Sequence, residues 1–175
     1  MEDKNTKEII NVLVDKYAKP LTPPPPIGIS GKEYEQFLVD RKSNKNRWLN
    51  KKMEVAIDPR LSMFDMNDKY LDTILFKEFI GTVQKRIQNK DSKRIDFEIT
   101  PTRSNVISFL DTTLVSKEKY RNSDVLLAFS RVYFNDDYSK AIIKVHFNRG
   151  WSSGFLVYCF LEKGKNGNWV LRYEK

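Results

Sequence analysis

Residues 124–175 alternate between apolar and polar positions in a pattern that predicts consecutive β-strands. Clusters of Asn, Asp and Gly separate the apolar runs, as they do in β-hairpins. In the second run Ala141, Ile143 and Val145 share one face while Lys144 lies on the other, which is typical of a half-buried antiparallel strand. The expected strands of this four-stranded meander cover residues 129–134, 140–147, 154–163 and 169–174.

The N-terminal segment has a helical period instead, and residues 5–8 form a capping-box motif at its start. Pro20 ends the expected helix, and the proline run 23–26 predicts a stiff polyproline spacer. The chain is therefore expected to divide into an N-terminal helix with its spacer, residues 1–30, and a single α+β domain, residues 31–175. The apolar face of the expected helix comprises Ile9, Ile10, Leu13, Val14 and Tyr17.

A second capping-box motif at residues 30–33 predicts a short helix after the spacer. Tyr34, Phe37 and Leu38 are spaced so that they lie on one side of this helix. The residues that follow are polar and basic, so the pattern indicates no further large apolar face before residue 53.

The strongest helical pattern of the chain covers residues 69–89, with Asn67 and Asp68 as its expected cap. Alternating patterns before and after it predict further strands. The fold class that follows is α+β: a curved antiparallel sheet with this long helix packed across its concave face. The additional strands are expected at residues 53–58, where Pro59 ends the run, and at 94–99 and 106–110.

The composition is that of a folded domain with a basic surface. The chain is 40% hydrophobic and 13% aromatic, which is enough to fill a core. Its formal net charge of +8 favours an anionic partner such as an acidic protein or nucleic acid. Because no apolar run approaches the length of a membrane span, no membrane-spanning segment is predicted.

The chain has few residues of the kinds that carry catalysis or bind metals. A single cysteine, Cys159, and a single histidine, His146, exclude an intramolecular disulfide and the usual Cys/His metal sites. We expect Cys159 to be a core residue and His146 to be an exposed strand residue. The clustered carboxylates near Asp68 and at Asp136 suit helix capping and turns. The sequence therefore predicts no enzyme, no cofactor and no metal site.

The end of the chain carries a set of motifs found together in one group of proteins. These are Phe-Asn-Asp-Asp at 134–137, Lys-Ala-Ile-Ile at 140–143, glycines at 150 and 154, and Gly-Asn-Trp-Val at 167–170. The pattern resembles the C-terminal half of a group of uncharacterised bacterial proteins of Bacteroidetes type, many of them predicted lipoproteins, which also have a Pro-rich stretch near the N-terminus. The resemblance implies a cell-envelope origin with the leader removed. A cytoplasmic location stays the alternative, because Met1 to Lys4 introduces no signal peptide.

Two segments contain candidate binding residues. The first is a basic segment in which cations surround an aromatic residue. This composition is typical of proteins that bind single-stranded nucleic acid. The alternative is a solvated loop that one aromatic side chain anchors to the protein. The second is a loop between Gly150 and Gly154, where Trp151 either contacts a ligand or folds back on the sheet. The residues of the basic segment are Arg41, Lys42, Lys45, Arg47, Trp48, Lys51 and Lys52.

These observations support three functional hypotheses. The first is a non-enzymatic binding module for a protein partner, for example an immunity-type inhibitor of an acidic toxin, which the positive charge would steer. The second is nucleic-acid binding through residues 41–52. The third is a small-molecule or enzymatic site in a cone-shaped pocket between the long helix and the sheet. The oligomeric state is not predicted by any of these patterns.

Overall fold

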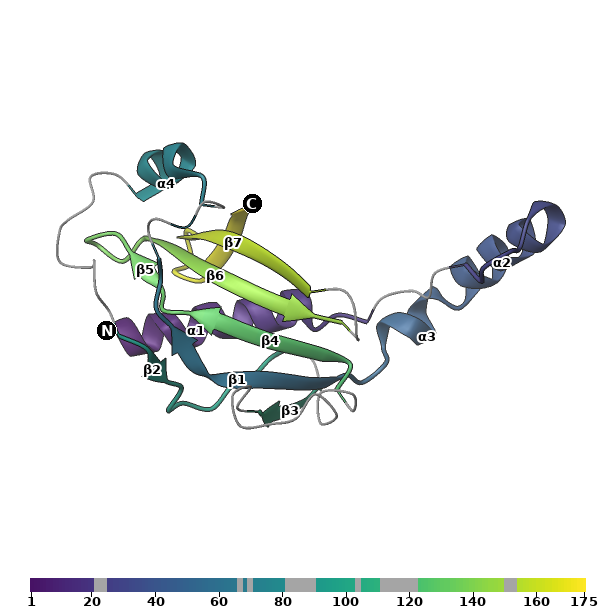
Figure 1. The fold of residues 1–175 in the computed structure, drawn as a ribbon, viewed down its shortest axis with the longest axis horizontal. Coiled ribbons are helices and arrows are strands. Elements are labelled where there is room, and N and C mark those ends of the chain that lie inside the picture. Colours follow the sequence, from purple (N-terminus) through teal and green to yellow (C-terminus); the bar gives the residue numbers. More distant parts are fainter. Residues whose placement is uncertain are drawn as a thin grey trace.

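A computed structural model describes residues 1–20, 25–65, 68, 71–80, 91–102, 105–110, 123–149 and 154–175. Within these residues the chain forms four helices and one mixed eight-stranded sheet, so the predicted α+β class is confirmed (Figure 1). The helices are α1 (Glu2–Tyr17), α2 (Gly31–Ser43), α3 (Lys45–Leu49) and α4 (Thr73–Ile80). The strands are β1 (Glu54–Ser62), β2 (Lys93–Arg94), β3 (Val106–Phe109), β4 (Val125–Ser130), β5 (Tyr133–Phe134), β6 (Lys140–Asn148), β7 (Gly154–Lys163) and β8 (Trp169–Glu174).

The sheet is mixed, whereas the sequence predicted an antiparallel one. Its strand order is β2-β1-β4-β6-β7-β8, with β3 beside β1 and β5 beside β6. The run β6-β7-β8 is antiparallel, as the hairpin turns predicted. However, β1 pairs in parallel with both β3 and β4. Parallel neighbours need long crossover connections, and the chain between β1 and β4 supplies one.

Three predicted strands differ clearly from the observed ones: only Lys93–Arg94 is a strand where residues 94–99 were expected to form one, and two others have different bounds. The expected strand 129–134 is divided between β4 and β5, which both pair with β6. At the division, the Ser130 hydroxyl accepts the Lys144 N–H at 2.9 Å in place of a backbone carbonyl. Strand β1 continues through Pro59 because the pairing register shifts between Ile57 and Leu61. Proline is tolerated in a strand at such a bulge.

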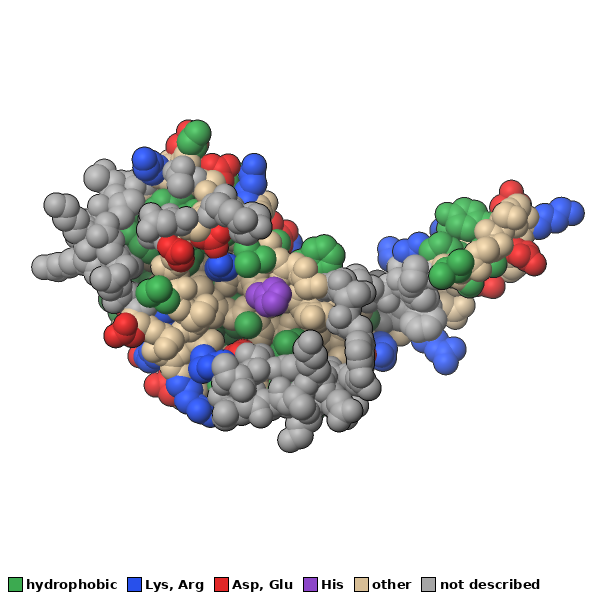
Figure 2. All heavy atoms as spheres, viewed as in Figure 1, with side chains coloured by type: hydrophobic (Ala, Val, Ile, Leu, Met, Phe, Trp, Pro, Cys, Tyr) green, Lys and Arg blue, Asp and Glu red, His purple; other side chains and the backbone are tan. Residues whose placement is uncertain are grey.

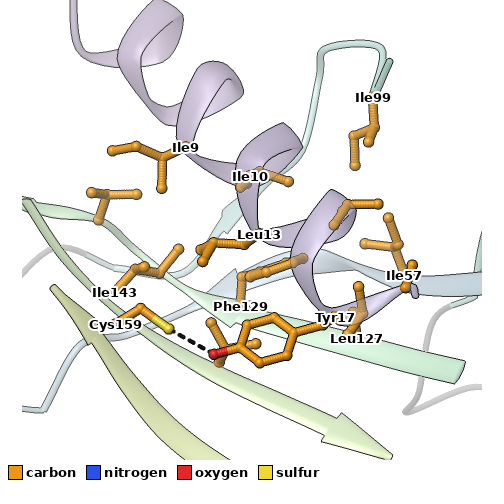
Figure 3. Packing of buried hydrophobic residues seen from close by; sticks show 14 of the residues in the cluster. Ile9, Ile10, Leu13, Tyr17, Ile57, Ile99, Leu127, Phe129, Ile143 and Cys159 are labelled. Atoms are coloured by element: carbon orange, nitrogen blue, oxygen red, sulfur yellow. Dashed lines mark hydrogen bonds between the residues drawn. The ribbon is translucent and has the colours of Figure 1, made fainter. Parts of the chain in front are cut away.

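Helix α1 packs against one face of the sheet, although the sequence interpretation placed it apart behind a proline spacer. Ile9, Ile10 and Leu13 are fully buried against strand residues of β1, β4, β6 and β7 (Figure 3). Burying each such side chain contributes about 1.5–3 kcal/mol. The helix begins at Glu2, so Asn5 is not its cap. Instead, the side-chain amide oxygen of Asn5 accepts the indole N–H of Trp169 at 3.2 Å.

Helix α4 packs on the opposite face of the sheet. Ile142 belongs to the cluster beneath α4, whereas its neighbour Ile143 belongs to the cluster beneath α1. Only residues 73–80 of the predicted helix 69–89 are described as helix, and residues 81–90 lie outside the described chain. The described part of the molecule therefore has three layers: α1, the sheet and α4.

The start of α4 corrects the predicted cap. The Asp72 carboxylate accepts the Leu75 N–H at 3.0 Å, which is the N-cap bond expected of an aspartate. Asp68, predicted to cap this helix, instead pairs with Lys144 on β6. An N-cap needs only a short polar side chain, and several such residues lie just before α4. The sequence alone therefore could not identify which of them caps the helix.

Candidate functional site

Residues 25–52, which we call the arm, project away from the sheet and carry α2 and α3 (Figure 1). Helix α2 buries none of its 13 residues. Tyr34 and Leu38 are each 42% exposed, and Val39 is 57% exposed. Most helices of globular proteins bury an apolar stripe against a core. In the part of the chain that the structure describes, nothing covers the apolar side chains of α2.

Local hydrogen bonds support α2 in the absence of core packing. The Gln36 amide donates to the Asp40 carboxylate one turn later at 2.9 Å, and the Ser43 hydroxyl donates to the Val39 carbonyl at 2.9 Å. The Asn44 N–H donates to the Asp40 carbonyl and closes the last turn. Ser30 is the N-cap residue of α2, but its side chain makes no capping hydrogen bond to the described backbone. The predicted capping box is therefore not formed.

The structure places the predicted basic residues at the end of α2, on α3 and just before β1. Arg41 and Lys42 lie in the last turn of α2, and Arg41 is half-buried. Trp48 lies within α3, but its side chain is outside the description, as is all of Trp151. Figure 2 shows hydrophobic side chains gathered on the outer part of the arm, with both basic and acidic side chains around them. The other predicted cations, Lys45, Arg47, Lys51 and Lys52, are all exposed.

Lys51 connects the arm to the sheet. Its ammonium lies 3.0 Å from the Asp124 carboxylate, and the same carboxylate accepts the Glu54 N–H at 2.9 Å. Burial raises the pKa of Asp124, but the Glu54 hydrogen bond and the Lys51 charge outweigh burial and hold the pKa below its ordinary value. Lys51 therefore has a positioning role at the base of the arm, which the sequence did not predict.

Cys159 occupies the core, as predicted, and is fully buried. Its sulfur lies 3.0 Å from the Tyr17 hydroxyl, which also donates to the Glu174 carboxylate (Figure 3). Lys16 pairs with the same carboxylate at 2.6 Å. Burial raises the pKa of Cys159 to about 12, so the thiol stays protonated at neutral pH. A protonated thiol is a poor nucleophile.

His146 is exposed on β6, as predicted. Its cross-strand neighbours are Ala128 and Leu156, and neither can accept a proton. Among the described residues, no three His, Cys, Asp or Glu side chains gather in a way that would hold a metal ion. These side chains offer no arrangement for nucleophilic or general-base chemistry.

A small polar group lies beside the α4 cluster. The Lys144 ammonium pairs with the Asp68 carboxylate at 2.5 Å and lies 5.7 Å from the centre of the Tyr158 ring. The hydroxyls of Tyr133 and Tyr158 are buried and find no hydrogen-bond partner among the described residues. Burial raises the pKa of both phenols. The space around them is packed with aromatic rings, including Phe64 and Phe76.

The same packing bears on the predicted cone-shaped pocket. The region between α4 and the sheet contains Phe76, Phe79 and Phe160, all buried, and Phe79 meets Phe160 edge to face at 5.6 Å. Aromatic side chains thus occupy the described region in which a ligand was expected to bind.

Comparison of the chain with protein-family models, with curated proteins and with solved structures finds no match. The resemblance to Bacteroidetes-type proteins therefore stays a prediction. Among the described helices, none is long and apolar enough to cross a membrane.

Sequence reasoning did not predict that the apolar side of α2 would be exposed. Tyr34, Phe37 and Leu38 were assigned to one helical side, with no prediction of what that side contacts. A signal was nevertheless present: α2 has only four large apolar residues in 13, and the nine residues that follow it, 44–52, contain four cations and no carboxylate. Such a helix has little apolar area to bury in a core.

Proposed function

We propose that this protein is a non-enzymatic binding module that holds an acidic protein through its arm. The observation that supports the proposal is the arm itself, an exposed helix with uncovered apolar side chains followed by a basic segment. Residues 25–52 contain seven Lys or Arg and three Asp or Glu, so the arm carries +4 of the net charge of +8. Exposed cations in this number steer an anionic partner to the surface.

The arm fits a protein better than nucleic acid. Tyr34 and Leu38 expose apolar area, which protein interfaces bury at their centres. Glu33 and Glu35 lie on the same helix and would repel phosphates. The predicted immunity-type inhibitor is one protein of this kind, because such a module works by covering an acidic partner rather than by catalysis.

Affinity isolation with matched charge variants tests this proposal. The tagged protein is isolated from lysates of the cells that express it, once at about 50 mM NaCl and once at about 500 mM NaCl. The two concentrations are compared because salt screens the attraction between exposed charges. The arm variant is Lys42→Gln/Lys45→Gln/Arg47→Gln. Its control removes three exposed cations from the body of the protein and changes the net charge equally: Lys4→Gln, Lys77→Gln and Lys165→Gln.

The expected result is an acidic protein that the wild type and the control retain at low salt, and that the arm variant and high salt both release. If the wild type retains no protein at low salt, or if both variants release it equally, the proposal is wrong. Retention that disappears after nuclease treatment would instead support the nucleic-acid hypothesis.

A further inference from the structure

The apolar side chains of α2 follow a spacing used for insertion into a groove. Tyr34, Phe37, Leu38 and Arg41 occupy positions i, i+3, i+4 and i+7, so they lie in one row along the helix. Tyr34 and Leu38 are each 42% exposed, and Phe37 and Arg41 are half-buried. We call these four residues the anchor face.

Apart from Val39, the rest of the helix surface is polar, and this limits what the anchor face can contact. Glu33, Gln36 and Asp40 are all exposed and lie on the opposite side of α2, where Gln36 bonds Asp40. The apolar row is therefore narrow. A helix that lies on a lipid surface needs a broad apolar face and a strongly cationic polar face. Here the polar face carries carboxylates, so a groove in a protein fits better than a membrane.

The charge order along the anchor face indicates the chemistry of the groove. Its first three members are aromatic or aliphatic, and the fourth is Arg41, after which come the cations of α3. A complementary groove would be apolar beneath Tyr34 and Leu38 and would carry carboxylates near Arg41, since arginine pairs well with carboxylates in partly desolvated sites.

We propose that the anchor face inserts into an apolar groove of the acidic partner, with carboxylates of that partner beside Arg41. This inference rests on the proposed function and adds the surface and the mode of recognition. It also identifies the residues expected to dominate the affinity, because buried aromatic and aliphatic anchors carry most of the binding energy in such interfaces.

Site-specific photo-crosslinking tests the proposal in the intact protein. The photoreactive amino acid p-benzoylphenylalanine replaces Phe37 in one variant and Val39 in a control variant. Val39 is 57% exposed, lies on the same helix and points away from the anchor face. After irradiation in cells that express the protein, adducts are separated by mass and identified.

We expect an adduct with an acidic protein at Phe37 and at least about tenfold less adduct at Val39. We also expect Leu38→Ala to weaken binding of the identified protein by about 30-fold and Val39→Ala to weaken it by less than about threefold, as for a hot spot and its surroundings. Both substitutions are at exposed positions, and circular dichroism checks that the helices persist.

Four results would overturn this inference: equal adducts at both positions, no protein adduct at Phe37, an adduct of lipid or nucleic acid, or an adduct with a second copy of this chain. Failure of this inference can be distinguished from failure of the proposed function. If the arm charge variant releases an acidic protein while Phe37 yields no specific adduct, the proposed binding of an acidic protein by the arm is supported. The proposal that the anchor face inserts into a groove is then wrong. If the wild type retains no acidic protein, both are wrong.

Discussion

Replacing the same residue type in two helices tests where the stability of this protein originates. Leu13 on α1 is fully buried in the main core, whereas Leu38 on α2 is 42% exposed. Leu13→Ala deletes buried methyl groups and leaves a cavity between α1 and the sheet. Such a change costs about 3–5 kcal/mol of unfolding free energy. Since small domains are stable by roughly 5–15 kcal/mol, the loss is a large fraction of the total.

Leu38→Ala should change the unfolding free energy by less than about 0.5 kcal/mol, because surface substitutions create no cavity. Both variants are measured by urea unfolding, followed by circular dichroism. If Leu13→Ala destabilises the protein no more than Leu38→Ala does, α1 is not part of the core. Equal large losses in both variants would mean instead that α2 packs against the body of the protein.

Three further predictions concern single side chains. Asp124 has a pKa below its ordinary value of 3.8, so its carboxylate stabilises the folded state above that pH and loses this effect as the pH falls. Asp124→Asn should therefore destabilise by about 1 kcal/mol at about pH 7, and the difference should shrink as the pH falls below 3.8 in urea unfolding experiments. A difference that persists in acid would contradict this. Cys159 should not react with a thiol reagent such as DTNB at about pH 8 until urea unfolds the protein, since the thiol is buried and protonated. Rapid labelling of the folded protein would show instead that β7 opens. Tyr133→Phe should be neutral or stabilising by up to about 1 kcal/mol, because it removes a buried hydroxyl that lacks a described partner. Thermal unfolding measures this effect, and a clear loss of stability would reveal a bond to that hydroxyl.

The C-terminal strands were the most predictable part of the fold because their pattern is local. Residues 140–147 alternate apolar and polar positions, residues 155–161 are a continuous apolar run beyond the turn, and β6 and β7 pair along nine residues. The face of β6 assigned to the core, from Ala141 to Val145, is the face that contacts α1. Local hydrophobic periodicity was sufficient here.

The parallel pairing of β1 could not be predicted in the same way. Val55 of β1 pairs with Val125 of β4, and the hydrophobic pattern of either strand is the same for parallel and antiparallel neighbours. Pro59 added a false boundary, because a bulge that accommodates proline depends on the partner strand. Long-range pairing decided both features.

The candidate site was predicted in part. The cations at 41–52 were identified because charge is visible in sequence, and the structure places them on the arm. Burial is not visible in this way. Lys51 looked equivalent to Lys52 but is paired with Asp124, and the sequence did not predict that Tyr34 and Leu38 would be exposed. Only the packing of distant segments separates these cases.

The position of α1 has a consequence for how the chain is made. The Asn5 side chain bonds Trp169, and Tyr17 bonds Glu174, so α1 contacts a strand that is synthesised 157 to 164 residues later in the chain. Until β8 is made, part of the surface that covers α1 is missing. The docking of α1 is therefore completed only after this strand leaves the ribosome, and the apolar face of the helix can aggregate before then. Truncation near residue 168 should consequently weaken the docking of α1 on the rest of the sheet.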